Sequence, residues 1–77
     1  MEKSRYLSEI QKLGMEIRKL RMDKEMTQET LSSLCDIDVR TIQRIEKGQQ
    51  NITLNILFAI SESLNVKPEY LIKASFL

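Results

Sequence analysis

The sequence predicts an all-α fold, a bundle of five helices. Three observations predict it. Apolar residues recur at helical spacing along most of the chain, no run of β-branched residues alternates with polar ones, and only two glycines and one proline interrupt the 77 residues. A chain of this length is too short for two independent cores, so we expect a single domain over residues 1–77.

The first predicted helix carries apolar side chains that repeat every three or four residues. They are Tyr6, Leu7, Ile10, Leu13, Ile17 and Leu20. The helix is expected to begin near Ser8 or at Ser4 and to end at about Asp23, with residues 1–12 forming an N-terminal helical extension. For the later start, Ser8 and Gln11 have the spacing of a capping box.

The second and third predicted helices each follow a residue that favours a helix N-terminus. Thr27 is expected to cap a helix from Gln28 to about Cys35, and Asp38 a helix over Val39–Lys47. Gly48 then ends the third helix as a C′ residue.

Two further helices complete the predicted bundle. Thr53 is expected to cap a helix over Leu54–Leu64. Pro68 suits the first position of a short helix that ends at about Ile72.

The connection between the second and third helices is about three residues long, which is the spacing of a helix-turn-helix motif, here over residues 27–47. Such a motif often binds DNA, yet the formal net charge is only +1, from 12 basic and 11 acidic residues. A nucleic-acid surface on this chain therefore requires that charge be segregated by face.

The third predicted helix separates its side chains into two faces. At about 100° per residue, an arc of about 140° holds basic, amide and small apolar groups and no acid, whereas Ile42 and Ile45 fall opposite. The residues of this arc are Val39, Arg40, Gln43, Arg44 and Lys47. Arginine can pair with guanine and glutamine with adenine, and valine can contact a thymine methyl group.

We therefore expect Val39, Arg40, Gln43 and Arg44 to read bases. Lys47, near the end of the helix, is better placed for a phosphate. The alternative is that this charged face contacts only solvent. The absence of acids from the arc weakens this alternative.

From Leu13 to about Ile72 the chain resembles the helix-turn-helix domain of the lambda-repressor/Cro-like group, the XRE family. Four segments carry the resemblance in order: LGMEIRKLR, MTQETLSSL, TIQRIEKG and NITLNILFAISESLNV. The resemblance implies a lambda-repressor-like bundle that binds the major groove of double-stranded DNA. The short chain and the stretch GQQNITLNIL also resemble the controller proteins of restriction–modification systems.

The resemblance implies roles for residues outside the third-helix arc. Gln28 is expected to contact a phosphate and to brace the third helix, and Arg21 and Glu46 to form an ion pair that ties the first helix to the end of the third. Glu46 lies between the two faces of its helix, where a partly buried carboxylate needs a partner. Three loop amides are placed to donate to phosphates beside the start of the fourth helix. They belong to Gln49, Gln50 and Asn51.

Two positions depart from the family pattern, which often has glycine at both. This chain has Asp36 in the turn of the motif and Glu25 before the second helix. Aspartate tolerates a positive φ comparatively well, whereas glutamate does not, so we expect modest strain or a different loop at Glu25. Ser32 is small enough to keep the close approach of the two helices.

The C-terminal part of the chain is more apolar than one core-facing stripe requires. Apolar residues of the fourth helix spread over about 200° of its circumference, and the tail YLIKASFL adds more. We therefore expect a homodimer, with an interface that includes Ile56, Phe58, Ile60, Tyr70 and Phe76. The alternative is a tail that packs on its own domain or frays.

The single cysteine and the absence of histidine exclude an internal disulfide and a Cys/His zinc site. No metal or cofactor is expected, and Cys35 is expected to be a buried, small apolar group. The start of the chain lacks the apolar core of a secretory signal, and no apolar run could span a bilayer. We expect a cytoplasmic, nucleoid-associated protein with no membrane partner.

Together these features predict a sequence-specific transcriptional regulator that binds a roughly palindromic operator as a homodimer. The alternative is a protein-interaction module, such as an antitoxin or an adaptor, which the near-neutral charge favours slightly. There is no glycine-rich phosphate loop and no nucleophile with a base at a recognisable spacing. We therefore expect no enzymatic activity, no catalytic residue and no small-molecule ligand. Asp36 and Asp38 are better explained by turn formation and helix capping.

Overall fold

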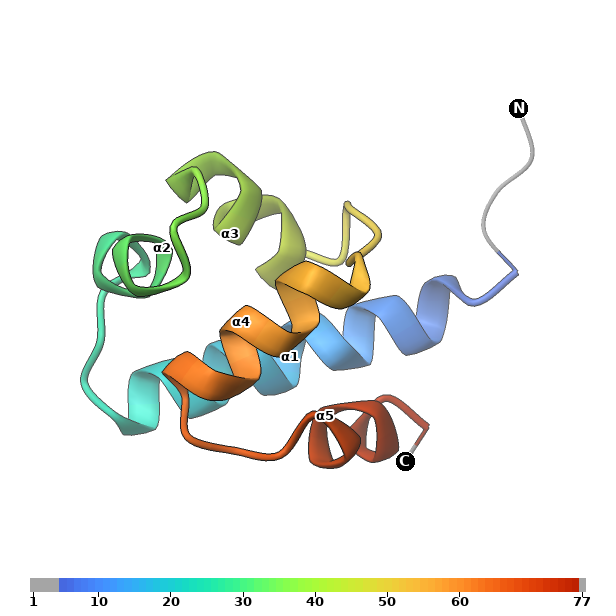
Figure 1. Cartoon of the computed structure of the whole chain (residues 1–77). Coiled ribbons are helices and arrows are strands. Elements are labelled where there is room, and N and C mark those ends of the chain that lie inside the picture. Colours follow the sequence, from blue (N-terminus) through green and yellow to red (C-terminus); the bar gives the residue numbers. More distant parts are fainter. Residues whose placement is uncertain (1–4, 77) are drawn as a thin grey trace.

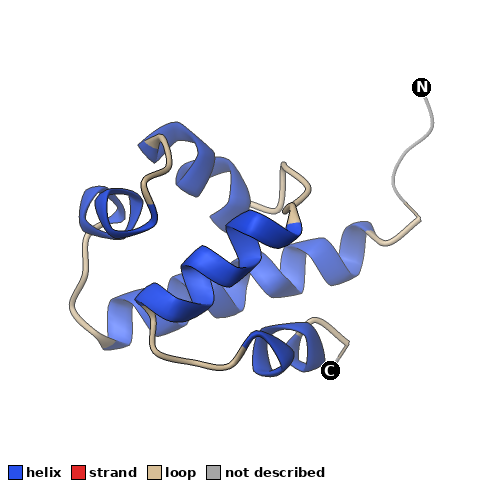
Figure 2. Cartoon of the chain, in the orientation of Figure 1, coloured by secondary structure: helices blue, strands red, loops and turns tan. Residues whose placement is uncertain are grey.

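The computed structural model describes residues 5–76 and contains five α-helices, with no strand in that range (Figures 1 and 2). They are α1 (Leu7–Asp23), α2 (Gln28–Cys35), α3 (Val39–Glu46), α4 (Leu54–Ser63) and α5 (Pro68–Ala74). The predicted all-α, five-helix fold is confirmed. The long α1 packs against α3 and α5, while α2 packs against α3 and α4.

The start of α1 differs from the prediction. Tyr6 is the N-cap residue and makes no side-chain capping bond. The backbone N–H of Ile10 donates to the Tyr6 carbonyl at 2.9 Å, which places Ser8 inside the first turn. The capping box of Ser8 and Gln11 is therefore wrong, because Ser8 is not the residue that precedes the helix. The alternative start at Ser4 lies outside the described residues.

The predicted N-caps of the next three helices are confirmed. The backbone N–H of Thr30 donates to Thr27 Oγ1 at 3.0 Å and that of Arg40 to Asp38 Oδ1 at 3.0 Å. Thr53 caps α4 in the same way, at 3.2 Å. Pro68 occupies the first turn of α5, as expected. The C-terminal ends of these helices lie within two residues of their predicted positions.

Three residues other than glycine have left-handed backbone conformations at helix ends. Asp36 (φ 56°), Glu25 (φ 57°) and Asn65 (φ 57°) each follow a helix, as does Gly48 with φ 70°. Asparagine and aspartate tolerate this region, whereas glutamate pays a steric cost there. The positive φ of Glu25 is therefore the source of the strain expected at this residue.

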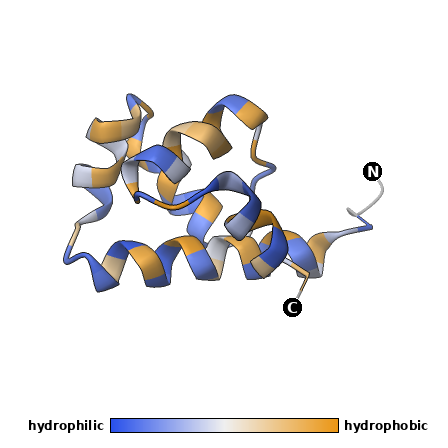
Figure 3. Cartoon of the chain, turned by 60° about the horizontal axis from the view of Figure 1, so that its bottom comes forward, coloured by the Kyte–Doolittle hydropathy of each residue, from blue (hydrophilic) through white to orange (hydrophobic). Residues whose placement is uncertain are grey.

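The core gathers aliphatic side chains from all five helices. Its fully buried members are Ile17, Leu31, Ile42, Ile45, Ile60, Leu64 and Leu71. In Figure 3 hydrophobic and hydrophilic residues alternate along α1, as expected for a helix with one stripe facing the core. Cys35 joins this core, as predicted, and shares a hydrogen bond of 3.3 Å with Ser63.

One predicted interface residue belongs to this core. Ile60 is 0 % exposed in the isolated chain, so its assignment to a dimer interface is wrong. It lies between Leu57 and Leu64 on the stripe of α4 that faces the other helices. Its apolar surface is used entirely by its own bundle.

Among the described residues, none of the helices is both long and apolar enough to cross a membrane.

Candidate DNA interface

The outer face of α3 is a solvent-exposed surface formed by Arg40, Gln43, Arg44 and Lys47. All four side chains are exposed, and Val39 beside them is half-buried. Together with Gln49 these four residues line one polar hollow, to which no acidic residue contributes. Ile42 and Ile45 are buried on the opposite side of the helix. The structure therefore brings together the predicted base-reading residues and Lys47.

The loop that follows α3 continues this surface. Gln49 and Asn51 are exposed and Gln50 is half-buried. The backbone N–H of Gln49 donates to the Arg44 carbonyl at 2.9 Å, and Gly48 takes the left-handed conformation that permits this reversal. The turn thus holds the Gln49 side chain beside the last turn of α3.

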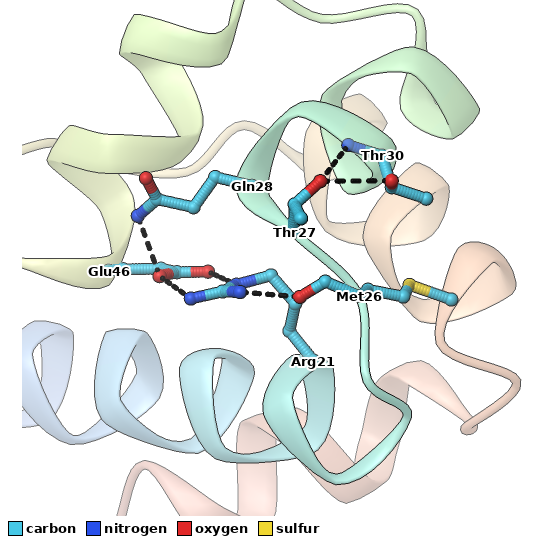
Figure 4. A network of polar contacts seen from close by, with 6 residues as sticks. All are labelled: Arg21, Met26, Thr27, Gln28, Thr30 and Glu46. Atoms are coloured by element: carbon cyan, nitrogen blue, oxygen red, sulfur yellow. Dashed lines mark hydrogen bonds and ion pairs between the residues drawn. The ribbon is translucent and has the colours of Figure 1, made fainter.

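A buried ion pair fixes the end of α3 to α1. Arg21 donates to both carboxylate oxygens of Glu46, through Nε to Oε2 at 2.7 Å and through Nη2 to Oε1 at 3.0 Å (Figure 4). The Arg21 side chain is 10 % exposed and that of Glu46 only 2 %. This is the ion pair that the sequence predicts. Its two-bond geometry is the arrangement in which arginine best matches a carboxylate.

The same network extends to the start of α2. Gln28 Nε2 donates to Glu46 Oε1 at 3.0 Å, and Arg21 Nη1 donates to the Met26 carbonyl at 2.6 Å (Figure 4). Gln28 therefore braces α3 through Glu46, while Thr27 caps α2 next to it. Three helices and the loop between α1 and α2 are joined by polar bonds at this one place.

Two glycines that the sequence analysis did not assign to the site set the distance between α1 and α3. A Cβ atom on Gly14 would overlap the carbonyl oxygen of Ile45 and lie 3.2 Å from that of Glu46. A Cβ atom on Gly48 would lie 2.6 Å from Cγ of Gln11. A glycine in the middle of a helix destabilises that helix. Gly14 was therefore the residue from which a close approach of another helix could have been predicted.

The predicted dimer residues, apart from Ile60, lie at or near the surface. Phe58 is 52 % exposed, Tyr70 46 % and Phe76 65 %, while Ile56 is half-buried against the core. Tyr70 Oη donates to Glu16 Oε2 at 2.7 Å and so ties α5 to α1. This bond, and the negative charge of Glu16, raise the pKa of Tyr70.

No cluster of residues suited to a metal ion occurs within residues 5–76.

A family model for the helix-turn-helix matches residues 17–71. The chain belongs to this family of DNA-binding transcription regulators. The match includes α2, α3 and the Arg21–Glu46 ion pair, and ends within α5. The predicted relationship to the XRE family is thus confirmed.

Three proteins that are similar to this chain are controller proteins. The control protein C.BamHI of Bacillus amyloliquefaciens is 37 % identical over 60 residues, which are 77 % of this chain and 74 % of that protein. The crystal structure of the restriction–modification controller protein C.AhdI from Aeromonas hydrophila matches with a TM-score of 0.79 and 32 % identity, over 80 % of this chain and 94 % of that one. Wild-type C.Esp1396I, another restriction–modification controller protein, matches with a TM-score of 0.76 and 30 % identity, over 96 % and 92 %.

Proposed function

We propose that this protein is a sequence-specific regulator of the controller type that binds a roughly palindromic DNA operator as a homodimer. The observation that carries the proposal is the outer face of α3, which is exposed, basic and free of acids. The helix has the length and side-chain chemistry to enter a major groove and pair with base edges. The protein acts in the cytoplasm, at the nucleoid, and needs no small-molecule ligand.

Base reading is assigned to Val39, Arg40, Gln43 and Arg44. Arg40 and Arg44 supply guanidinium groups for guanine, Gln43 an amide for adenine, and Val39 a small apolar group for a thymine methyl. Because Ile42 and Ile45 anchor the opposite side in the core, the helix has a fixed rotation about its axis. The four side chains therefore approach the DNA in one register.

Contacts to the DNA backbone are assigned to residues around this helix. Lys47 and the loop amides of Gln49, Gln50 and Asn51 lie at its C-terminal end, and Gln28 at its flank. Gln28 uses its Nε2 to bond Glu46, and the second N–H of the same amide group is the donor for a phosphate. Such contacts set the position of the protein and do not specify the sequence.

The homodimer is supported by the exposed apolar surface of α4 and α5. Phe58 and Phe76 are more than half exposed, and Tyr70 and Ile72 nearly half. Tyr70 and Ile72 also line an open groove of largely apolar surface that runs beside Val66 and along α5. A second copy that covers this surface would present two α3 helices to successive major grooves, about 34 Å apart.

Selection of bound sites from a random duplex library tests the whole proposal. We expect an enriched inverted repeat whose half-sites are separated by about one helical turn of DNA. Failure to enrich any sequence would overturn the proposal.

Substitution of Arg44 tests base reading on the selected site. Arg44→Ala should weaken specific binding by about 1–3 kcal/mol and leave folding intact, as judged by circular dichroism. Arg44→Lys is the matched control, because it keeps the charge but loses the planar fork that pairs with guanine. If Arg44→Lys binds the selected site as tightly as the native protein, Arg44 contacts only phosphate.

A further inference from the structure

A second hollow lies between α1 and the C-terminal end of α3. It is lined by Met15, Arg18, Lys19, Met22, Asp23 and Glu46. Apart from Glu46, which ends α3, all of these residues belong to α1. Its two cations, Arg18 and Lys19, have no role in the proposed function described above.

Arg18 is an exposed guanidinium that forms no hydrogen bond or ion pair with any other residue of the described chain. Two acidic residues line the hollow: Asp23 is exposed and forms no hydrogen bond or ion pair with Arg18, and Glu46 is already satisfied. One oxygen of that carboxylate accepts from Arg21, and the other accepts from both Arg21 and Gln28 (Figure 4). Arg18 is therefore not required as a counter-ion inside the protein and is available to an external anion.

The position of Arg18 on α1 directs it toward the flank of α3. Gly14 and Arg21 face α3, as the close approach to Ile45 and the bonds to Glu46 show. At about 100° per residue, Arg18 lies about 40° from Gly14 around the helix axis. Glu16, which bonds α5 through Tyr70, lies about 160° from Arg18 on the opposite side.

Two exposed methionines lie beside Arg18 in the hollow. Met15 is 68 % exposed and Met22 53 %, and they occupy positions three before and four after Arg18, on the same side of the helix. Apart from Asp23 and Glu46, the residues that line the hollow beside the guanidinium are apolar or basic.

We propose that Arg18 is a further contact to the DNA backbone, donating two hydrogen bonds to one phosphate that flanks the groove occupied by α3. The inference rests on the proposed function, since it requires bound duplex DNA. Arg18 then contacts the DNA backbone from α1, and Gln28 contacts it from the start of α2. The planar guanidinium suits the two oxygens of a phosphate, as it suits those of a carboxylate.

The salt dependence of DNA binding tests the proposal, because each phosphate contact contributes about −0.9 to the slope of log K against log salt. Binding of a mixed-sequence duplex should be measured for the native protein and Arg18→Gln between about 0.05 and 0.2 M salt. Because the proposed dimer carries two copies of Arg18, we expect the slope of Arg18→Gln to be shallower by about 1.8, with binding of the dimer about thirtyfold weaker at 0.15 M. Arg18→Lys should restore most of the slope.

Lys24→Gln is the matched control. It removes the same charge from an exposed position at the C-terminal end of α1, outside both the hollow of Arg18 and the groove proposed for the dimer. Its slope should equal that of the native protein, with the dimer checked by sedimentation.

The possible results separate this proposal from the proposed function. If the native protein binds no duplex, the proposed function fails. If Arg44→Ala and Lys47→Gln weaken binding while Arg18→Gln retains the native slope, only the Arg18 contact is overturned. A uniform loss of affinity at every salt concentration, with the slope unchanged, would mean that Arg18 acts through the position of Glu46 and would equally overturn it.

Discussion

Gly14 of α1 lies directly beneath the carbonyl oxygen of Ile45 in α3, so close that no Cβ atom fits between them. Ile45 is the next-to-last residue of α3, and its side chain is buried in the core. The contact therefore sets how far the C-terminal end of α3 lies from α1. It also brings Glu46 within reach of Arg21.

Gly14→Ala is expected to destabilise the protein by about 1–3 kcal/mol, because the added methyl group must displace the backbone of α3. The sign of this change in unfolding free energy distinguishes the two effects, because alanine in place of glycine would stabilise an isolated helix by about 1 kcal/mol. Urea denaturation measures the change. The control is Ser8→Ala, an exposed position of the same helix, where we expect a change within about 0.5 kcal/mol. A more stable Gly14→Ala protein would contradict the close contact.

The Arg21–Glu46 ion pair should behave as one unit. Arg21→Met and Glu46→Leu each leave a buried charge without its partner, and each should cost about 3–5 kcal/mol of folding free energy. The double variant Arg21→Met/Glu46→Leu should cost less than the sum of the two by about 0.5–3 kcal/mol. Denaturant unfolding of all four proteins completes the cycle, and additive costs would show that the two side chains are not coupled.

Phe58→Asp should dissociate the proposed dimer without unfolding the chain. A charge placed in an apolar interface should weaken self-association by about 2 kcal/mol or more, which sedimentation equilibrium measures. Leu34→Asp on α2 is the matched control, because Leu34 is 57 % exposed and Phe58 52 %. Unchanged self-association of Phe58→Asp would exclude this part of α4 from the interface.

Cys35 should make folding stability sensitive to alkaline pH. Burial raises the pKa of its thiol above the ordinary value of 9.0, although the hydrogen bond with Ser63 acts in the opposite direction. The unfolded thiol therefore ionises first, and the stability gained from a neutral, buried thiol is present below about pH 9 and is lost as pH rises toward the folded pKa.

Cys35→Ala removes this titration. The difference in unfolding free energy between the native protein and Cys35→Ala should be constant from pH 6 to about pH 8 and should shrink above about pH 9. Other groups titrate in both proteins and cancel in the difference. A difference that grows with pH would reverse the assigned shift.

Local chemistry made much of the structure predictable. Thr27, Asp38 and Thr53 cap their helices as expected, because a side-chain oxygen before a helix bonds the N–H groups of its own first turn. The two faces of α3 were equally predictable, since Ile42 and Ile45 share one side at helical spacing. The order of residues along the chain is sufficient to predict both the helix caps and the two faces of α3.

The five helices, most of their boundaries and the acid-free arc of α3 could therefore be predicted, since each depends on residues within a few positions of one another. Which apolar side of α4 is covered depends on the packing of the helices: Ile60 is buried and Phe58 exposed, although both lie on one broad apolar arc. The same packing places Gly14 against Ile45 and Arg18 beside Glu46. Those arrangements depend on the distances between helices, which are set by the packing of the whole core and not by the period of any single segment.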